Sequence, residues 1–336
     1  MDATGWADNK LSRSCQGFYP DGLVPIPYTM VDETDLQLTG ALNDNPRASY
    51  REMANLTGLS VNSVHKRVQA LIDQGTIMGF FASLGPSAER YIIAAAFGVT
   101  STDDLEATIA KMGMDEHTKQ VIVSTNDYLY PQWHMRDMSE MDDFIDFCRD
   151  VALIGEPHVI FRTPTPPPGQ EMVKLSGLDY RIIDSLAKDA RKPDTQVAEE
   201  LGISPKTVHR HLERMQKEGS ITLSTLFSTN QARDIFTFLH VKLRKGVNRR
   251  EASSLLQEKY GPRLLNVQMI ESDPSLFICN VWTRTMRDLK EVRTGVERED
   301  FIESLKVNVL YDYHVFDTWR DGLVRKRAAE AGRRSR

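Results

Sequence analysis

Two short stretches of the sequence place polar and basic side chains at the spacing of one helical face. Residues three and four apart share a face of a helix, so each set can act on one partner. Such side chains pair with phosphate oxygens and hydrogen-bond the edges of bases. The chemistry they predict is non-covalent recognition of a nucleic acid. The first set is Asn62, Ser63, Lys66 and Arg67, and the second is Lys206, Thr207, Arg210, His211 and Arg214.

These stretches are two copies of one unit. Gly58–Ile77 reads GLSVNSVHKRVQALIDQGTI, and Gly202–Ile221 reads GISPKTVHRHLERMQKEGSI. An offset of 144 residues relates the copies without a gap from Asp35 and Asp179 through Gly75 and Gly219. Apolar residues recur at helical spacing in both copies, which predicts three short helices with one buried stripe each. The stripe comprises Leu36, Leu38, Leu42, Met53, Ala54, Leu56, Val64, Val68, Leu71 and Ile72 in the first copy and Ile182, Leu186, Val197, Ala198, Leu201, Val208, Leu212 and Met215 in the second.

The last helix of each unit has a clear start signal. Ser60 and Ser204 stand where an N-cap is favoured, and Pro205 takes the first helical position. The helix before it is expected at about 49–56 and 195–201, with a glycine turn between the two helices. This is a helix-turn-helix, whose second helix can lie in the major groove of double-stranded DNA. The Gly-x-Ile that follows each unit predicts the start of a β-hairpin wing.

After each unit, strand and helix patterns follow in the order β-α-β-β-α-β, which is typical of a ferredoxin-like fold. We therefore expect an α+β protein in which a winged helix-turn-helix and a ferredoxin-like domain occur twice. In the first copy the six elements are expected at 91–99, 103–112, 120–124, 128–135, 140–151 and 158–163. In the second copy they are expected at 235–243, 249–260, 264–271, 276–284, 286–295 and 307–316.

Composition changes mark the domain boundaries. Four prolines between Pro164 and Pro168 favour an extended spacer. The segment 319–336 is rich in Lys and Arg and is expected to be a mobile basic tail. The expected order is an irregular extension at 1–30, helix-turn-helix 1 at 31–86, ferredoxin-like domain 1 at 87–163, a linker at 164–176, helix-turn-helix 2 at 177–230, ferredoxin-like domain 2 at 231–318 and the tail at 319–336.

Composition also limits the function. The formal net charge of −5 gives no global attraction to a polyanion, so DNA recognition must rest on placement. Cys15, Cys148 and Cys279 are scattered, which fits a cytoplasmic protein without disulfides or a zinc site. The sequence has no GxGxxG, GxSxG, P-loop or HExxH motif, so we expect no cofactor and no catalytic residue. His209 and His211 point to different helix faces, so we expect no metal site. No stretch has the length of a signal peptide core or a membrane span.

The repeated unit resembles the DNA-binding domain of Lrp/AsnC-type transcription regulators. The matching pattern runs from Asp35 through Gly58, Val64 and Gly75 and recurs from Asp179. The resemblance implies a DNA-binding regulator whose ferredoxin-like domains bind an effector and form oligomers. The family often carries Gly-x-x-Asp-Tyr/Phe before its third sensor strand. Here Asp127 and Tyr128 match that pattern without its glycine, and they are the candidate effector-binding residues.

Fusion of two copies predicts an intramolecular pseudo-dimer in which the ferredoxin-like halves pair through their sheets. Position 67 is Arg in the first copy and its equivalent is His211, so the two helices are expected to read different bases. We also expect pairing of further chains. A small-molecule effector remains open.

Two other interpretations remain. Siroheme decarboxylases resemble Lrp/AsnC regulators and occur as two-copy chains, and an enzyme of that kind would bind an anionic tetrapyrrole. The residues considered for that role are Tyr130, Trp133, His134 and Arg136, or Trp282, Arg284 and Arg287. The other interpretation is an interaction protein that does not bind DNA, for which the basic tail would only aid solubility.

Overall fold

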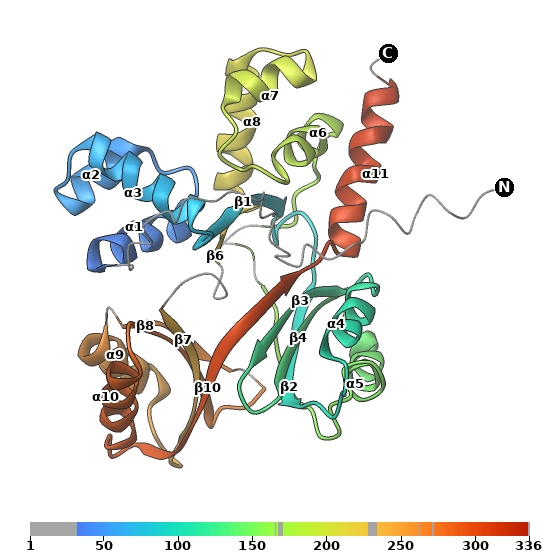
Figure 1. Cartoon of the computed structure of the whole chain (residues 1–336). Coiled ribbons are helices and arrows are strands. Elements are labelled where there is room, and N and C mark those ends of the chain that lie inside the picture. The colour runs from blue at the N-terminus through green and yellow to red at the C-terminus, as the bar shows by residue number, and fades with distance from the viewer. Residues whose placement is uncertain are drawn as a thin grey trace, which may run out of the picture. The chain divides into compact units, whose positions relative to one another are not determined.

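A computed structural model describes residues 32–164, 166, 171–227, 234–261, 263–270 and 272–334 (Figure 1). The expected irregular extension at 1–30 and much of the proline-rich linker lie outside the described residues. The chain forms two compact units. The reader unit contains both helix-turn-helix copies, in Thr34–Tyr91, Thr163–Ser228 and Asp317–Arg336. The sheet unit contains both ferredoxin-like halves, in Ile92–Arg162 and Thr229–Phe316.

Each copy in the reader unit has the three expected helices around one core. Most of the apolar residues predicted for the buried stripes are buried. Leu36, Ile72 and Leu201 are only half-buried, and the prediction is wrong for Leu56, which is 62% exposed near the end of the second helix. The helices of the first copy are α1 (Glu33–Asp44), α2 (Tyr50–Thr57) and α3 (Val61–Asp73). Those of the second copy are α6 (Gly177–Leu186), α7 (Asp194–Leu201) and α8 (Pro205–Lys217).

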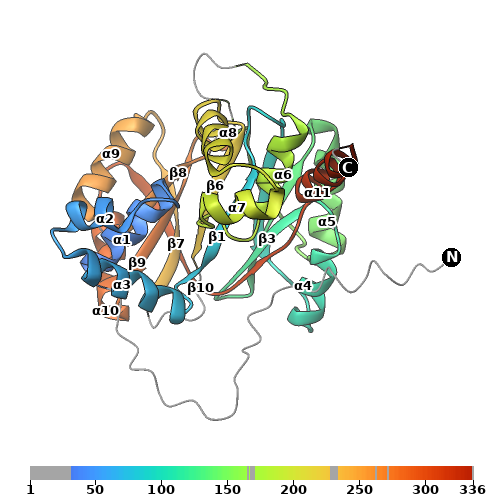
Figure 2. The same cartoon turned by 90° about the horizontal axis from the view of Figure 1, so that it is seen from above.

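The strand after each unit pairs with its counterpart in the other copy. β1 (Ile77–Leu84) and β6 (Ile221–Phe227) form an antiparallel two-stranded sheet, side by side between the two helical groups (Figure 2). The expected β-hairpin within each copy is therefore wrong for the described residues. Because each copy supplies only one strand here, the other copy provides the backbone partner that a hairpin would have provided.

The register of this small sheet is symmetric. Phe80 pairs with Thr225, which is the equivalent of Phe81, and Phe81 pairs with Ser224, which is the equivalent of Phe80. Each strand thus contacts the other through the same positions, as in the isologous interface of a two-fold dimer. The two copies are related by a pseudo-two-fold axis through this ladder.

The C-terminal segment is not a mobile tail. Residues Trp319–Arg334 form helix α11, which packs along α6 and against β1 (Figure 1). Val324 and Ala328 are buried, and Arg320 donates a hydrogen bond to the Leu84 carbonyl oxygen at 2.6 Å. The basic composition concealed this apolar stripe, because Arg and Lys can cover a helix whose other side is buried.

The sheet unit contains two βαββαβ halves, as predicted. Its eight strands form one sheet in the order β5-β2-β4-β3-β10-β7-β9-β8. The first half comprises β2 (Ile92–Val99), α4 (Leu105–Gly113), β3 (Thr118–Ser124), β4 (Tyr128–Met135), α5 (Met141–Asp150) and β5 (His158–Arg162). The second comprises β7 (Ile235–Leu243), α9 (Arg249–Tyr260), β8 (Leu264–Met269), β9 (Leu276–Thr283), α10 (Met286–Glu297) and β10 (Ile302–Val315).

Strand β10 joins the two halves. It has 14 residues and starts five residues before the expected Val307. Its first part pairs with β7, and its last part, from Leu310 to Val315, pairs with β3 of the first half. The long strand crosses between the two halves in Figure 1. The equivalent strand of the first half, β5, ends at Arg162, just before the proline run in the sequence.

The two halves also share a core. Each half packs its own helices on one face of its strands. On the opposite face, apolar residues of both halves form one cluster, to which Phe97, Ile122 and Tyr130 contribute from the first half and Ile270, Ile278 and Leu310 from the second. The expectation that the halves pair through their sheets is confirmed, both by this cluster and by the β3–β10 ladder.

Candidate nucleic-acid interface

Local hydrogen bonds hold the start of each recognition helix. The Ser60 hydroxyl accepts a hydrogen bond from the Ser63 backbone N–H at 3.1 Å, and Ser204 accepts one from Thr207 at the same distance. The glycine two residues before each cap has a left-handed conformation, with φ of 72° at Gly58 and 68° at the equivalent residue of copy two. Such a turn is compatible with glycine and sets the angle between the two helices.

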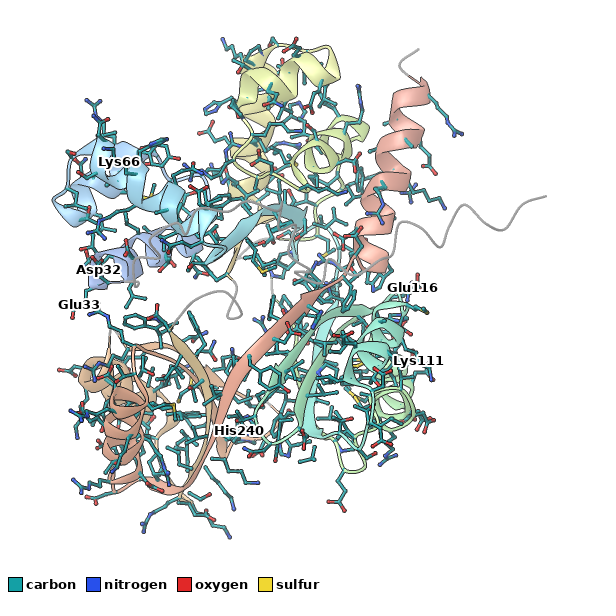
Figure 3. All side chains as sticks on the ribbon, viewed as in Figure 1. Asp32, Glu33, Lys66, Lys111, Glu116 and His240 are labelled. Atoms are coloured by element: carbon teal, nitrogen blue, oxygen red, sulfur yellow. The ribbon has the colours of Figure 1, made fainter. Side chains whose placement is uncertain are left out.

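Four of the nine predicted side chains lie fully on the surface of these helices. They are Asn62 and Lys66 on α3 and Lys206 and Arg210 on α8. Figure 3 labels Lys66 on the first of these helices. Each pair is four residues apart and therefore forms one ridge near the N-terminal end of its helix. We call these the recognition ridges. The N-terminal residues of a recognition helix are those that reach base edges in helix-turn-helix proteins.

Two further predicted residues belong to the caps. The side chains of Ser63 and Thr207 are half-buried, and their hydroxyls lie 2.9 Å from the hydroxyls of Ser60 and Ser204. Their first role in the structure is to stabilise the helix start. This arrangement keeps them beside the recognition ridges without placing them on the ridges.

The three remaining predicted residues are turned toward the first helix of their own copy. Arg67 Nη1 lies 2.9 Å from Asp35 Oδ1. In the second copy, His211 Nδ1 lies 2.7 Å from Asp179 Oδ1, and Arg214 donates to the same oxygen. These contacts hold the recognition helix against the bundle. They also explain why the repeat begins with an aspartate in both copies.

Asp179 is fully buried and stays charged because of its partners. Burial by itself would raise the pKa of Asp179, but hydrogen bonds from Arg214, His211 and Ser176 outweigh it and lower the pKa below its ordinary value. The same carboxylate closes the capping box at the start of α6 with Ser176. One buried charge therefore joins the first helix and the recognition helix of the second copy.

The ridges include residues that the sequence-based prediction omitted. Exposed side chains continue each ridge at His65 and Gln69 on α3 and at His209 and Glu213 on α8. His209 Nδ1 lies 3.2 Å from Asp194 Oδ2, while the His65 ring packs edge-on against Tyr50. The signal that would have found them is the same helical spacing carried one turn further. Glu213 was absent from a prediction that sought basic residues.

Contacts between the copies fix the spacing of the two recognition helices. Arg47 Nη2 lies 2.6 Å from Asp194 Oδ1. In the opposite direction, Arg191 Nη1 donates to the carbonyl oxygens of Pro46 at 2.7 Å and Ala48 at 3.0 Å. Together with the β1–β6 ladder, these bonds make the reader unit one body instead of two domains on a flexible chain.

The candidate effector residues lie in the sheet unit. Asp127 has a left-handed backbone (φ 55°) in the β3–β4 turn, and its carbonyl oxygen accepts a hydrogen bond from the Thr100 N–H at 2.9 Å. The Tyr128 ring packs near Tyr130 and His240 in the shared core. Burial, with Lys306 and His158 nearby, lowers the pKa of His240 to about 4, so this residue is neutral at physiological pH.

The residues considered for tetrapyrrole chemistry are divided between the two faces of the sheet and the surface. Tyr130 faces the shared core, with its hydroxyl 3.1 Å from His240 Nε2, whereas Trp133 packs in the helix-covered core beside Phe144. Arg136 is paired with two glutamates at the surface. In the second half, Trp282 is buried, and Arg284 Cζ lies 5.7 Å from the centre of its ring. Arg287 is exposed on α10. Neighbouring strand residues point to opposite faces, which separates these side chains.

Within the described residues, no group of three His, Cys, Asp or Glu side chains could hold a metal ion. No helix in that part of the chain is long and apolar enough to cross a membrane.

Comparison with known proteins supports the same division of the chain. A family model described as winged helix-turn-helix DNA-binding matches residues 31–78 and again residues 175–222. The regulator Ptr1 of Methanocaldococcus jannaschii is 31% identical over 100 residues, which are 30% of this chain and 68% of Ptr1. The regulator LrpA of Pyrococcus abyssi is 30% identical over 101 residues, covering 30% of this chain and 72% of LrpA.

A solved structure resembles nearly the whole chain. The crystal structure of the siroheme decarboxylase NirDL, in complex with an iron-uroporphyrin III analogue, matches with a TM-score of 0.54. The match covers 89% of this chain and 98% of NirDL, at 11% sequence identity. At that identity the likeness concerns the tandem fold. The chain belongs to the Lrp/AsnC-type helix-turn-helix regulator family, as a tandem member with two DNA-binding domains.

Proposed function

We propose that the chain is a sequence-specific, DNA-binding transcription regulator and not an enzyme. It acts as an intramolecular pseudo-dimer whose two recognition helices read two different half-sites. One observation carries this proposal: a symmetric β1–β6 ladder relates two capped recognition helices whose exposed ridges differ in sequence. A two-fold arrangement of recognition helices matches the two-fold arrangement of half-sites on a duplex.

The ridges suggest how the half-sites differ. At equivalent positions α3 presents Asn62 and Lys66, whereas α8 presents Lys206 and Arg210. Asparagine can bind adenine through two hydrogen bonds, and arginine is the commonest partner of guanine. We assign Asn62 and Arg210 to base contacts, and the two lysines to phosphate or guanine contacts. The half-site under α8 is then the more guanine-rich of the two.

The residues bonded to Asp35 and Asp179 have a different role. Arg67, His211 and Arg214 hold the angle of the recognition helices, and their partly exposed guanidinium groups can add phosphate contacts from the flank. Loss of these side chains would weaken binding to all sequences. Loss of a ridge side chain would change the preference at particular positions, because only base contacts carry sequence information.

Half-site exchange tests this proposal. Binding sites are first selected from random duplexes with the full chain, and one half-site is then replaced by a copy of the other. A symmetric site should bind about 10-fold or more weakly than the asymmetric site, because each mismatched base pair costs about 1–3 kcal/mol. A symmetric site that binds as tightly as the asymmetric site would contradict the proposal.

Side-chain truncation assigns the half-sites. Lys66→Ala should weaken binding through one half-site, and Arg210→Ala through the other, each by about 1–3 kcal/mol. Arg250→Ala is a matched control, because this exposed arginine lies on α9 of the sheet unit. A chain that fails to select any sequence from the pool would overturn DNA recognition.

The alternative is an enzyme of the siroheme decarboxylase kind, which the tandem-fold likeness to NirDL favours. In that case the face between the two halves, with His240 and Tyr130, would be expected to bind an anionic tetrapyrrole. Chain purified from cells supplied with a tetrapyrrole precursor should then be coloured. Saturable binding of a tetrapyrrole with release of CO₂ would replace the non-enzymatic proposal, whereas colourless protein that selects a DNA sequence agrees with it.

A further inference from the structure

The outer edge of β8 is unpaired within the described residues, although the equivalent strand of the first half is paired on both sides. β8 stands at the end of the sheet and pairs only with β9. Its counterpart β3 has β4 on one side and the last part of β10 on the other. Pseudo-symmetry would place the continuation of β5 beside β8. That continuation is the proline-rich stretch, and proline has no backbone N–H to donate.

One hydrogen bond connects β5 to the segment that follows β8. The Phe161 N–H in β5 donates to the Ser272 hydroxyl at 3.3 Å, just beyond β8. β5 ends one residue later, at Arg162. The six residues Leu264–Met269 therefore keep one row of backbone donors and acceptors without a strand partner in the described structure. Such an edge accepts another strand.

The edge also lacks most of the features that protect edge strands. Its sequence, LLNVQM, contains no charged residue and no proline. A bulge interrupts the register between Leu264 and Asn266, and the strand is regular after it. Leu265 is 46% exposed and Met269 is 45% exposed. Charged residues, prolines and bulges are the usual protection of edges, and here only the bulge is present.

A buried amide points to the same edge. In the first half, the Tyr313 hydroxyl of β10 donates to Gln120 Oε1 at 2.6 Å, and Gln120 Nε2 donates to Gln132 Oε1 at 3.2 Å. The equivalent pair in the second half is Asn266 and Asn280, which also lie opposite each other. Asn280 Oδ1 is buried and has no hydrogen-bond partner among the described residues. Among the described residues, the second half has no strand that covers this edge as β10 covers β3.

We propose that two copies of the chain pair through this edge, β8 against β8 in antiparallel orientation. The sheet then continues across a two-fold axis, as the β3–β10 ladder continues it within one chain. Asn266 and Gln268 lie on one face of β8, and each amide can both donate and accept. In the pair, the Gln268 amide of the second copy can donate to Asn266 Oδ1, as the Tyr313 hydroxyl donates to Gln120 Oε1. That hydrogen bond orients Nδ2 of Asn266 toward Asn280.

A second copy suits the edge better than a foreign peptide. Antiparallel pairing of one strand with itself uses the same groups on both sides, which gives the closed symmetry of most homodimers. The exposed apolar side chains of Leu265 and Met269 are then covered by their counterparts. The resulting pair of chains contains four recognition helices and forms without DNA.

Mass measurement on DNA-free protein tests this pairing. From about 1 to 100 µM, light scattering or sedimentation should show the mass rising to twice the 38.2 kDa of one chain. The double variant Leu265→Lys/Met269→Lys should keep the single-chain mass, because four lysines would meet across the edge. Met286→Lys is the matched control, since Met286 is 63% exposed on α10, and it should behave as wild type. A wild-type chain of single mass throughout, or a folded double variant with the wild-type mass, overturns the proposal.

Amide exchange gives a second readout that does not need the double variant. The backbone N–H groups of Leu264–Met269 that face outward should exchange at least about 10-fold more slowly at the high concentration than at the low one. Gln268→Lys should abolish that difference. Exchange rates that are independent of concentration in wild type would overturn the proposal. Neither measurement involves DNA, so its failure is separate from failure of the regulator function.

Discussion

The two helix-turn-helix copies have the same helices but hold them differently. In the first copy, Asp35 pairs with Arg67, which is partly exposed on the recognition helix. In the second copy, fully buried Asp179 pairs with His211 and Arg214, and α11 covers the first helix as well. The second recognition helix is therefore anchored more strongly. The comparison shows how a duplicated fold can acquire two readers that differ both in the bases they meet and in rigidity.

The largest expected effect comes from removing the two anchors. Asp179→Asn should lower the free energy of unfolding by about 3 kcal/mol, because it leaves two basic groups without their shared buried carboxylate. Asp35→Asn should cost about 1 kcal/mol, since its partner Arg67 is partly exposed and water screens the pair. Chemical denaturation of the full chain followed by circular dichroism measures both. Equal losses in the two variants would contradict the difference in anchoring.

Acid should weaken the second copy through the same carboxylate. The pKa of folded Asp179 lies below its ordinary value, so the ionised group stabilises the fold above about pH 4. That contribution is lost as the pH falls through the lower, folded pKa. Amide exchange of α8 should therefore accelerate between neutral pH and pH 3, after correction for intrinsic exchange. Asp179→Asn is the control, and its α8 should respond less to acid.

The difference in base reading can be removed by making the ridges equal. Asn62→Lys, Lys66→Arg and Gln69→Glu together give α3 the ridge residues of α8. The triple variant should come to prefer a symmetric site built from the α8 half-site, with a shift of about 1–2 kcal/mol relative to wild type. Competition binding with both duplexes measures the shift. Unchanged preference would mean that the bases are read by residues outside the ridges.

The smallest effect concerns the middle helices. α2 begins with a capping box of Ser49 and Glu52, whereas Pro193 stands at the equivalent start of α7 without a side-chain hydrogen bond. Ser49→Ala should cost about 1 kcal/mol of unfolding free energy. Pro193→Ser should gain less than that, because the new hydrogen bond is offset by the greater freedom of the unfolded chain. Thermal unfolding compares the two, and a large loss for Pro193→Ser would show a further role of the proline.

Helical spacing predicted which side chains are exposed for some of the candidate residues and not for others, and the reason is geometric. Helical spacing placed Asn62, Lys66 and Arg210 on exposed faces, and they are exposed. The same spacing could not reveal that Arg67, His211 and Arg214 lie within reach of an aspartate about 30 residues earlier. A basic side chain at the border of a helical face can point into solvent or toward the bundle. Its direction depends on whether the packing of the first helix places an acidic side chain within its reach.

The chain's own pattern was sufficient for the repeat, the buried stripes, the helix caps and the βαββαβ order, because these depend on residues close together in the sequence. Three-dimensional packing was needed to pair β1 with β6, to carry β10 past its own half onto β3, and to lay α11 on α6. Each of these contacts joins segments more than 100 residues apart, and many partners satisfy a strand edge or an apolar stripe equally well until the whole fold selects one.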